Sequence, residues 1–194
     1  VLNAFQEFRV KEVHFNSTTG YGYDDIGRDT IEKIFARVLK AEDAIVRNQF
    51  ISGTHALTVT LFGLLRPGAT MLAISGKPYD TMDETIFGIE GKDNGSLKDF
   101  GVKYEQIELV NDNCFNFEEI EKKLSEISPK IIYIQRSRGY SLRNGINIAK
   151  IETIISICFM LLILFIKFWK GDFFILFSSL LFIKKYIFLP YIYI

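Results

Sequence analysis

The sequence predicts an α/β fold with a mainly parallel sheet over residues 1–150. Helix-like and strand-like segments alternate along this part of the chain, and the loops between them are short. No internal repeat or low-complexity stretch interrupts the alternation. Ligands of parallel α/β sheets bind at the carboxyl ends of the strands, so the loops that follow the strands are the places where a site is expected.

Helices are predicted where apolar residues recur near a period of 3.6 residues. The strongest pattern lies at residues 24–40, where Asp24 and Asp25 favour the positive end of the helix dipole. Asp80 or Thr81 is suited to cap a later helix. In chain order the predicted helices cover residues 2–10, 24–40, 52–65, 81–89 and 117–127.

Strands are predicted at short apolar or alternating runs bounded by turn residues. The run at residues 130–134 is apolar after its first lysine, which is typical of a buried strand. The Gly/Ser/Thr-rich segment at residues 16–23 is predicted to be a loop. In chain order the predicted strands cover residues 44–46, 70–74, 102–109 and 130–134.

Composition excludes several classes of protein. Lys plus Arg and Asp plus Glu both number 23, so the chain lacks the positive charge on which nucleic-acid binding depends. Two cysteines cannot build a disulfide framework, and two histidines cannot build a multi-histidine metal site. We therefore expect neither a nucleic-acid partner nor a metal.

Residues 151–194 differ in composition from the rest of the chain. They contain four lysines and two acidic residues among many Ile, Leu, Phe and Tyr, so we expect an apolar, helical tail that forms a separate region. Its apolar stretches within residues 153–183 would suit a membrane segment, although each uninterrupted run is shorter than the roughly 20 residues that span a bilayer. A frameshift or unspliced read-through in an A/T-rich gene would also produce this composition. Both interpretations stay open.

The first candidate site is the turn Ser52-Gly53-Thr54, which opens a predicted helix. The unpaired N–H groups and the positive dipole at a helix start favour a phosphate. Gly53 would let the backbone approach an anion closely. A plain helix cap by Ser52 explains the same residues equally well. The sequence has neither a P-loop nor a dinucleotide-binding fingerprint.

Three further groups of residues follow predicted turns or strands. Tyr21, Tyr23 and Arg28 on a glycine-rich loop suit an anionic aromatic ligand, or form an ordinary exposed turn. Tyr79 follows the strand at residues 70–74 and would stack on a flat ring or pack on a helix start. A last pair, Arg136 and Arg138, follows the strand at residues 130–134 and would bind a carboxylate or phosphate, or be solvated.

Taken together, these segments resemble the methionine gamma-lyase family, also called the aluminium resistance protein branch, of the pyridoxal-phosphate enzymes of cysteine and methionine metabolism. The resemblance covers about residues 1–150. The matching motifs are HFNSTTGYGYDDIGRDTIEKIFA, VRNQFISGTHAL, LFGLLRPGATML, GKPYDTMDE, GSLKDFGVKY and IQRSRGYSLR.

This resemblance implies part of a fold-type-I, aspartate-aminotransferase-like large domain over residues 1–150. It implies pyridoxal phosphate as cofactor, a sulfur amino acid as substrate, carbon–sulfur lyase activity, a cytoplasmic homo-oligomer, and no membrane unless the tail is genuine. The implied cofactor contacts are Ser52, Gly53 and Thr54 on the phosphate, Tyr79 on the ring, and Tyr21, Tyr23 and Arg28 on a neighbouring subunit's phosphate. The implied substrate contacts are Arg136 and Arg138.

The chain departs from the family pattern after residue 150. The family's Schiff-base lysine and the acid that pairs with the pyridine nitrogen both lie beyond the segment that matches residues 131–143. No lysine of residues 1–150 occupies the family position. We therefore expect no catalytic lysine, no covalent cofactor attachment and no activity in this 194-residue chain, which would be a truncated member of the family. The alternative is a membrane-tethered, non-catalytic protein with a phosphate-binding turn.

Overall fold

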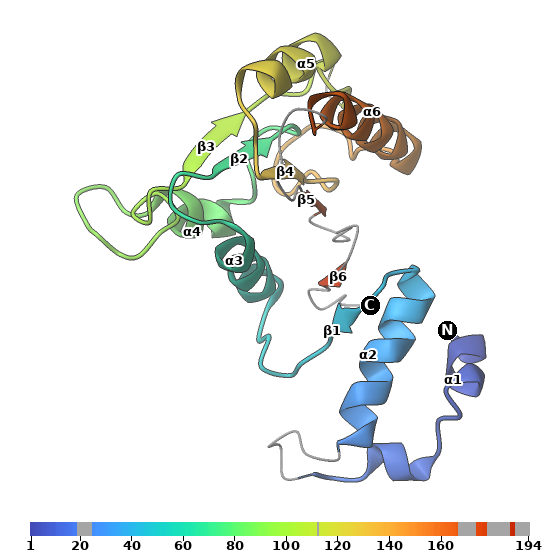
Figure 1. Ribbon diagram of the computed structural model, residues 1–194. Helices are drawn as coiled ribbons and strands as arrows, with labels where there is room; N and C mark the ends of the chain where they lie inside the picture. Colours follow the sequence, from blue (N-terminus) through green and yellow to red (C-terminus); the bar gives the residue numbers. More distant parts are fainter. Residues whose placement is uncertain (19–24, 112, 167–173, 178–186, 189–194) are drawn as a thin grey trace. The chain divides into compact units, whose positions relative to one another are not determined.

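The computed structural model describes residues 1–18, 25–111, 113–166, 174–177 and 187–188 (Figure 1). The chain forms two compact units, which are described separately below. Unit 1 comprises residues 1–56 and 180–194, and unit 2 comprises residues 57–179. The boundary falls within one continuous helix, α3 (Gly53–Leu64).

A parallel four-stranded sheet in the order β3-β2-β4-β5 organises unit 2. Met71 of β2 lies opposite both Tyr104 of β3 and Ile131 of β4, and Ile131 lies opposite Phe174 of β5. The strands are β2 (Thr70–Ala73), β3 (Lys103–Gln106), β4 (Ile131–Ile134) and β5 (Phe174–Phe177). The predicted α/β class and the mainly parallel sheet are confirmed.

The two central strands carry the core of unit 2. All four residues of β4 are buried, as are the last three of β2, whereas the ends of β3 are exposed. A parallel strand covered on both faces excludes water from every side chain, which explains why residues 130–134 are almost continuously apolar. The sheet lies between helices, with α5 and α6 above it and α4 below it (Figure 1). These helices are α4 (Asp83–Phe87), α5 (Phe117–Glu126) and α6 (Ile148–Ile166).

The predicted helix at residues 81–89 is shorter and split. A 3-10 turn, η2 (Asp80–Met82), leads into α4, which ends before Gly88. Gly88 has φ +74°, and a Cβ atom there would lie 2.8 Å from the Ser96 Oγ. A left-handed backbone and a close neighbour at Gly88 therefore end this helix at Phe87, two residues earlier than its apolar pattern predicts.

The composition change at residue 151 falls inside α6, which packs on α5. Ile151, Ile154 and Cys158 are each no more than 2% exposed, so the start of the tail belongs to the core of unit 2.

The prediction of a helical tail is correct only to Ile166. Beyond it, β5 pairs with β4 in parallel, and the two-residue β6 (Ile187–Phe188) pairs with β1. Apolar runs of aromatic and β-branched residues suit strands. Among the described residues, which include part of the predicted membrane segment at 153–183, no helix is long and apolar enough to cross a membrane.

Unit 1 consists of short helices and a two-stranded parallel sheet. Asp25 caps α2 by accepting a hydrogen bond from the Arg28 backbone N–H at 3.0 Å. The predicted helix at residues 2–10 ends at Glu7, because Arg9 adopts a left-handed φ of 51° and the Val10 N–H donates to the Phe5 carbonyl. The elements are α1 (Leu2–Glu7), η1 (Glu12–Phe15), α2 (Ile26–Leu39), β1 (Ala44–Ile45) and β6.

Candidate functional site

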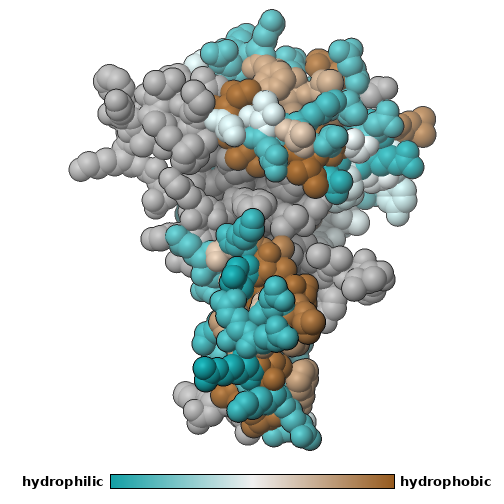
Figure 2. Space-filling model, turned by 90° about the vertical axis from the view of Figure 1, so that its right-hand side faces the viewer, coloured by the Kyte–Doolittle hydropathy of each residue, from teal (hydrophilic) through white to brown (hydrophobic). Residues whose placement is uncertain are grey.

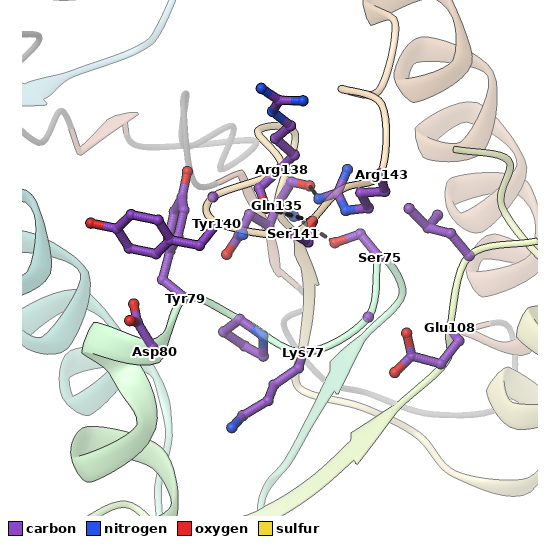
Figure 3. A pocket seen from close by; sticks show the side chains of 14 residues that line it. Ser75, Lys77, Tyr79, Asp80, Glu108, Gln135, Arg138, Tyr140, Ser141 and Arg143 are labelled. Atoms are coloured by element: carbon purple, nitrogen blue, oxygen red, sulfur yellow. Dashed lines mark hydrogen bonds between the residues drawn. The ribbon is translucent and has the colours of Figure 1, made fainter. Parts of the chain in front are cut away.

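A pocket of about 470 Å³ opens at the carboxyl ends of β2, β3 and β4 in unit 2 (Figure 3). The chain leaves β2 toward α4 and leaves β4 toward α6, on opposite sides of the sheet (Figure 1). Adjacent strands whose connections diverge in this way leave a crevice between them, where ligands of such sheets bind. The lining residues are Ser75, Gly76, Lys77, Pro78, Tyr79, Asp80, Glu108, Leu109, Gln135, Arg138, Gly139, Tyr140, Ser141 and Arg143.

The ring of Tyr79 forms one wall of this pocket. Tyr79 is half-buried, and burial raises the pKa of its hydroxyl, while the positive charge of Arg143 acts in the opposite direction. Its hydroxyl is therefore neutral at physiological pH. The loop after β4 meets this ring at Gly139, where a Cβ atom would lie 3.1 Å from the Tyr79 Cδ1 and Cε1 atoms. Gly139 also has φ +58°, so the close approach and the backbone conformation both favour glycine.

To the side of Tyr79, a hydrogen-bond network joins the ends of β2 and β4 (Figure 3). The Gln135 N–H donates to the Ser75 Oγ at 2.7 Å. The Arg143 Nη2 donates to the Gln135 carbonyl at 3.1 Å and to the Ser137 carbonyl at 2.7 Å. These bonds fix the start of the loop against the sheet.

Of the two predicted arginines, only Arg138 lines the pocket. The Arg136 Nε instead donates to the Ile146 carbonyl at 3.3 Å. Arg143, which was not singled out from the sequence, does line the pocket. Burial lowers the pKa of Arg143, and Tyr79 and Glu108 oppose that shift. The sequence feature that could have identified Arg143 is its position on the loop that follows β4, which also carries Arg138.

Lys77 is the lysine of the pocket lining, and it is engaged elsewhere. Its Nζ lies 2.7 Å from the Asp83 Oδ2 and 5.6 Å from the centre of the Phe87 ring. The amine of Lys77 is therefore engaged by an ion pair and a cation–π contact. The structure therefore gives no reason to assign Lys77 a catalytic role.

The candidate phosphate turn belongs to unit 1 and is described by itself. The Ser52 Oγ accepts from the His55 N–H at 3.0 Å, which is a helix cap. The Gly53 and Thr54 N–H groups have no partner among the residues that the structure describes. A helix cap and an anion-binding turn are thus compatible, because Ser52 satisfies the His55 N–H and the N–H groups of Gly53 and Thr54 remain unpaired among the described residues.

The glycine-rich loop predicted at residues 16–23 lies only partly within the described residues. Tyr21 and Tyr23 lie outside the described residues. Arg28 is half-buried on the first turn of α2, and its Nε lies 3.7 Å from the Asp25 Oδ2.

The turn in unit 1 and the pocket in unit 2 each have chemical groups that fit a part of pyridoxal phosphate. The turn in unit 1 offers two unpaired N–H groups of the kind that hold a phosphate. The pocket in unit 2 offers an aromatic wall at Tyr79 and a buried amide oxygen, the Gln135 Oε1, that has no partner in the described part of the chain. Stacking and a hydrogen bond are the contacts that a flat, polar ring requires.

The chain has an α/β fold similar to that of pyridoxal-phosphate enzymes. A pyridoxal-phosphate-dependent protein of Escherichia coli, YhfS, shares this fold at 16% identity, with a TM-score of 0.51 over 78% of this chain and 33% of that one. The model of the methionine gamma-lyase family matches residues 1–174. The chain belongs to the methionine gamma-lyase family, and the match extends beyond the residue-150 limit drawn from the motifs.

More similar proteins support this assignment. A crystallised carbon–sulfur lyase involved in aluminium resistance from Clostridium novyi is 44% identical, with a TM-score of 0.79 over 91% of this chain. A candidate cystathionine beta-lyase involved in aluminium resistance from Clostridium acetobutylicum is 39% identical, also with a TM-score of 0.79. The Bacillus subtilis protein YnbB is 46% identical over 156 residues.

The chain spans only part of these relatives. It covers 37% of YnbB and 40% of each of the two clostridial proteins.

Proposed function

We propose that this chain carries the cofactor-binding part of a pyridoxal-phosphate-dependent carbon–sulfur lyase that acts on sulfur amino acids. The observation that carries the proposal is a pocket at the carboxyl ends of three parallel strands, walled by Tyr79, in a member of the methionine gamma-lyase family. When bound, pyridoxal phosphate would supply an electron-withdrawing ring that stabilises negative charge on the substrate's α-carbon.

In this proposal, the residues of the chain bind and orient. Tyr79 stacks on the ring, and the Gly53 and Thr54 N–H groups bind the phosphate. Arg138 lines the pocket and is suited to bind the substrate carboxylate. Arg136 is set aside as a substrate contact, because its Nε bonds to a backbone carbonyl and it does not line the pocket.

We further propose that the 194-residue chain holds the cofactor without a covalent bond and does not turn over substrate. The support is that Lys77 is paired with Asp83 and that no lysine of residues 1–150 matches the family's catalytic position. Borohydride treatment of the chain with pyridoxal phosphate, followed by mass spectrometry, should leave no stoichiometric adduct on one lysine. Such an adduct together with turnover of methionine would contradict this part of the proposal.

Stacking on Tyr79 is tested by calorimetric titration with pyridoxamine 5′-phosphate, which has no aldehyde and so cannot react with surface lysines. Tyr79→Ala should weaken binding by about tenfold, because it removes the aromatic wall. Tyr79→Phe keeps the ring and should bind like the wild type. Equal affinities for all three proteins would contradict the proposed ring contact.

The phosphate contact is tested at Gly53. Gly53→Pro removes one N–H group at the first helical position, where proline is tolerated. It should weaken binding of pyridoxamine 5′-phosphate by about tenfold and leave binding of pyridoxamine, which lacks the phosphate, unchanged. Thr54→Ala keeps its N–H and serves as the control. An equal loss for both ligands would argue against a phosphate contact at this turn.

A further inference from the structure

Gln135 stands at the carboxyl end of β4 with its side chain in the wall of the pocket (Figure 3). It is only 4% exposed. Its Nε2 donates to the Ser137 carbonyl at 3.3 Å, and its backbone N–H donates to the Ser75 Oγ. Its Oε1 is buried and has no hydrogen-bond partner among the described residues.

The orientation of this amide follows from its neighbours. The Ser137 carbonyl can only accept a hydrogen bond, so the nitrogen end of the amide must face it. The opposite orientation would bring two oxygen atoms to 3.3 Å. The Arg143 Nη2 holds both the Gln135 and Ser137 carbonyls, so the segment cannot easily turn its acceptor elsewhere.

A buried acceptor without a partner is costly, since it has lost its hydrogen bonds to water. The pocket's carboxylates already have partners: the Asp80 Oδ1 accepts from the Thr81 N–H, and the Glu108 Oε1 accepts from the Gln106 Nε2. The Gln135 Oε1 is therefore a buried acceptor in the pocket lining that the described residues leave without a partner.

We propose that Gln135 is a ligand-binding residue whose Oε1 accepts a hydrogen bond from an N–H or O–H group of the molecule in the pocket. The inference rests on the proposed function, in which that molecule is a pyridoxal derivative. Such a ligand offers donors of two kinds: those on the ring, which are the hydroxyl and the protonated pyridine nitrogen, and the amino nitrogen on the adjacent side arm. Ser75 and Arg143 act as positioning residues, because they hold the backbone of Gln135.

The test compares two ligands on the full chain by calorimetry. Pyridoxamine 5′-phosphate carries the ring donors and the amino nitrogen, and 4-deoxypyridoxine 5′-phosphate carries the ring donors alone. Gln135→Met keeps the shape of the side chain and removes the acceptor, and it should weaken binding of pyridoxamine 5′-phosphate by about tenfold. A loss with both ligands assigns a donor on the ring, and a loss with pyridoxamine 5′-phosphate alone assigns the amino nitrogen.

The melting temperature separates a binding role from a structural one. Without ligand, Gln135→Met should melt at or above the wild-type temperature, because it removes an unpaired buried acceptor while Arg143 still satisfies the Ser137 carbonyl. Gln6→Met, which changes an exposed glutamine on α1 outside the pocket lining, is the matched control and should bind like the wild type.

Two results would overturn the inference while leaving the proposed function intact. One is wild-type affinity of Gln135→Met for both ligands. The other is a lower melting temperature with fewer binding sites but an unchanged Kd, which would make the glutamine structural. If the wild-type chain binds neither ligand, the proposed function fails and the inference fails with it.

Discussion

The two units bury their apolar residues very differently. Unit 2 encloses large side chains completely, including Leu72, Ile132 and Tyr133, which are at most 1% exposed on β2 and β4. Among the described residues of unit 1, the buried apolar positions are mostly alanines. They are Ala4, Ile34, Ala36, Ala44 and Ala56.

Larger apolar side chains of unit 1 stay open to solvent. Ile26, Ile31 and Val38 on α2 are 44%, 40% and 38% exposed, and apolar side chains lie among hydrophilic ones in Figure 2. A parallel sheet covered on both faces removes far more apolar area from water than a few short helices do. The packing free energy therefore resides mainly in unit 2, which also holds the pocket.

The largest expected effect comes from one substitution made in each unit. Ile132→Ala should lower the free energy of unfolding by about 2–5 kcal/mol, because it leaves a cavity in a close-packed sheet. Ile31→Ala removes the same atoms from an exposed site and should change it by less than about 0.5 kcal/mol. Urea unfolding followed by circular dichroism measures both. Equal losses would mean that α2 is as well packed as β4.

A smaller difference is expected between two arginines. Arg143→Met should cost about 1–3 kcal/mol, since it leaves the carbonyls of the buried Gln135 and the half-buried Ser137 without this donor. Arg37 in unit 1 pairs with Glu7 at 2.9 Å, but both side chains are about half exposed. Arg37→Met should therefore cost less than about 1 kcal/mol in the same assay. A larger loss of unfolding free energy for Arg37→Met than for Arg143→Met would contradict this prediction.

The smallest effect is expected in acid, at the start of α2. The hydrogen bond from the Arg28 N–H lowers the pKa of Asp25 below its ordinary value of 3.8. A lowered pKa means that the ionised form stabilises the fold at neutral pH and that this contribution is lost as pH falls through the folded-state pKa. Amide exchange of Arg28 should therefore accelerate below about pH 4 beyond the intrinsic change.

Asp25→Asn provides the control for the acid experiment, because it keeps an oxygen acceptor and cannot titrate. Its Arg28 amide should show no such acid-dependent loss of protection. In unit 2, hydrogen bonds from Ser96 lower the pKa of Asp99 in the same way, and that carboxylate offers a second reporter. Acid sensitivity at Asp99 but not at Asp25 would contradict the cap assigned to α2.

Local patterns predicted most elements to within a few residues. The helix at residues 117–127 is observed as α5, and the strand at residues 130–134 is observed as β4. The predicted ends of two helices were wrong where the backbone is left-handed, near Arg9 and Gly88. The spacing of apolar residues carries no information about the backbone angle φ. The strands beyond residue 166 were missed, because an apolar run alone does not distinguish a strand from a helix.

The sequence by itself determined the α/β class, the family and the post-strand loops that carry Tyr79 and Arg138, because these depend on residue type and spacing along the chain. Only the tertiary structure decided that β2 lies beside β4, which brings Ser75 to the backbone of Gln135 across 60 positions of sequence. It alone placed Arg143 on two carbonyls and left the Gln135 Oε1 buried without a partner. Burial and hydrogen-bond satisfaction are properties of neighbours in space, and strand order, which no local pattern encodes, sets those neighbours.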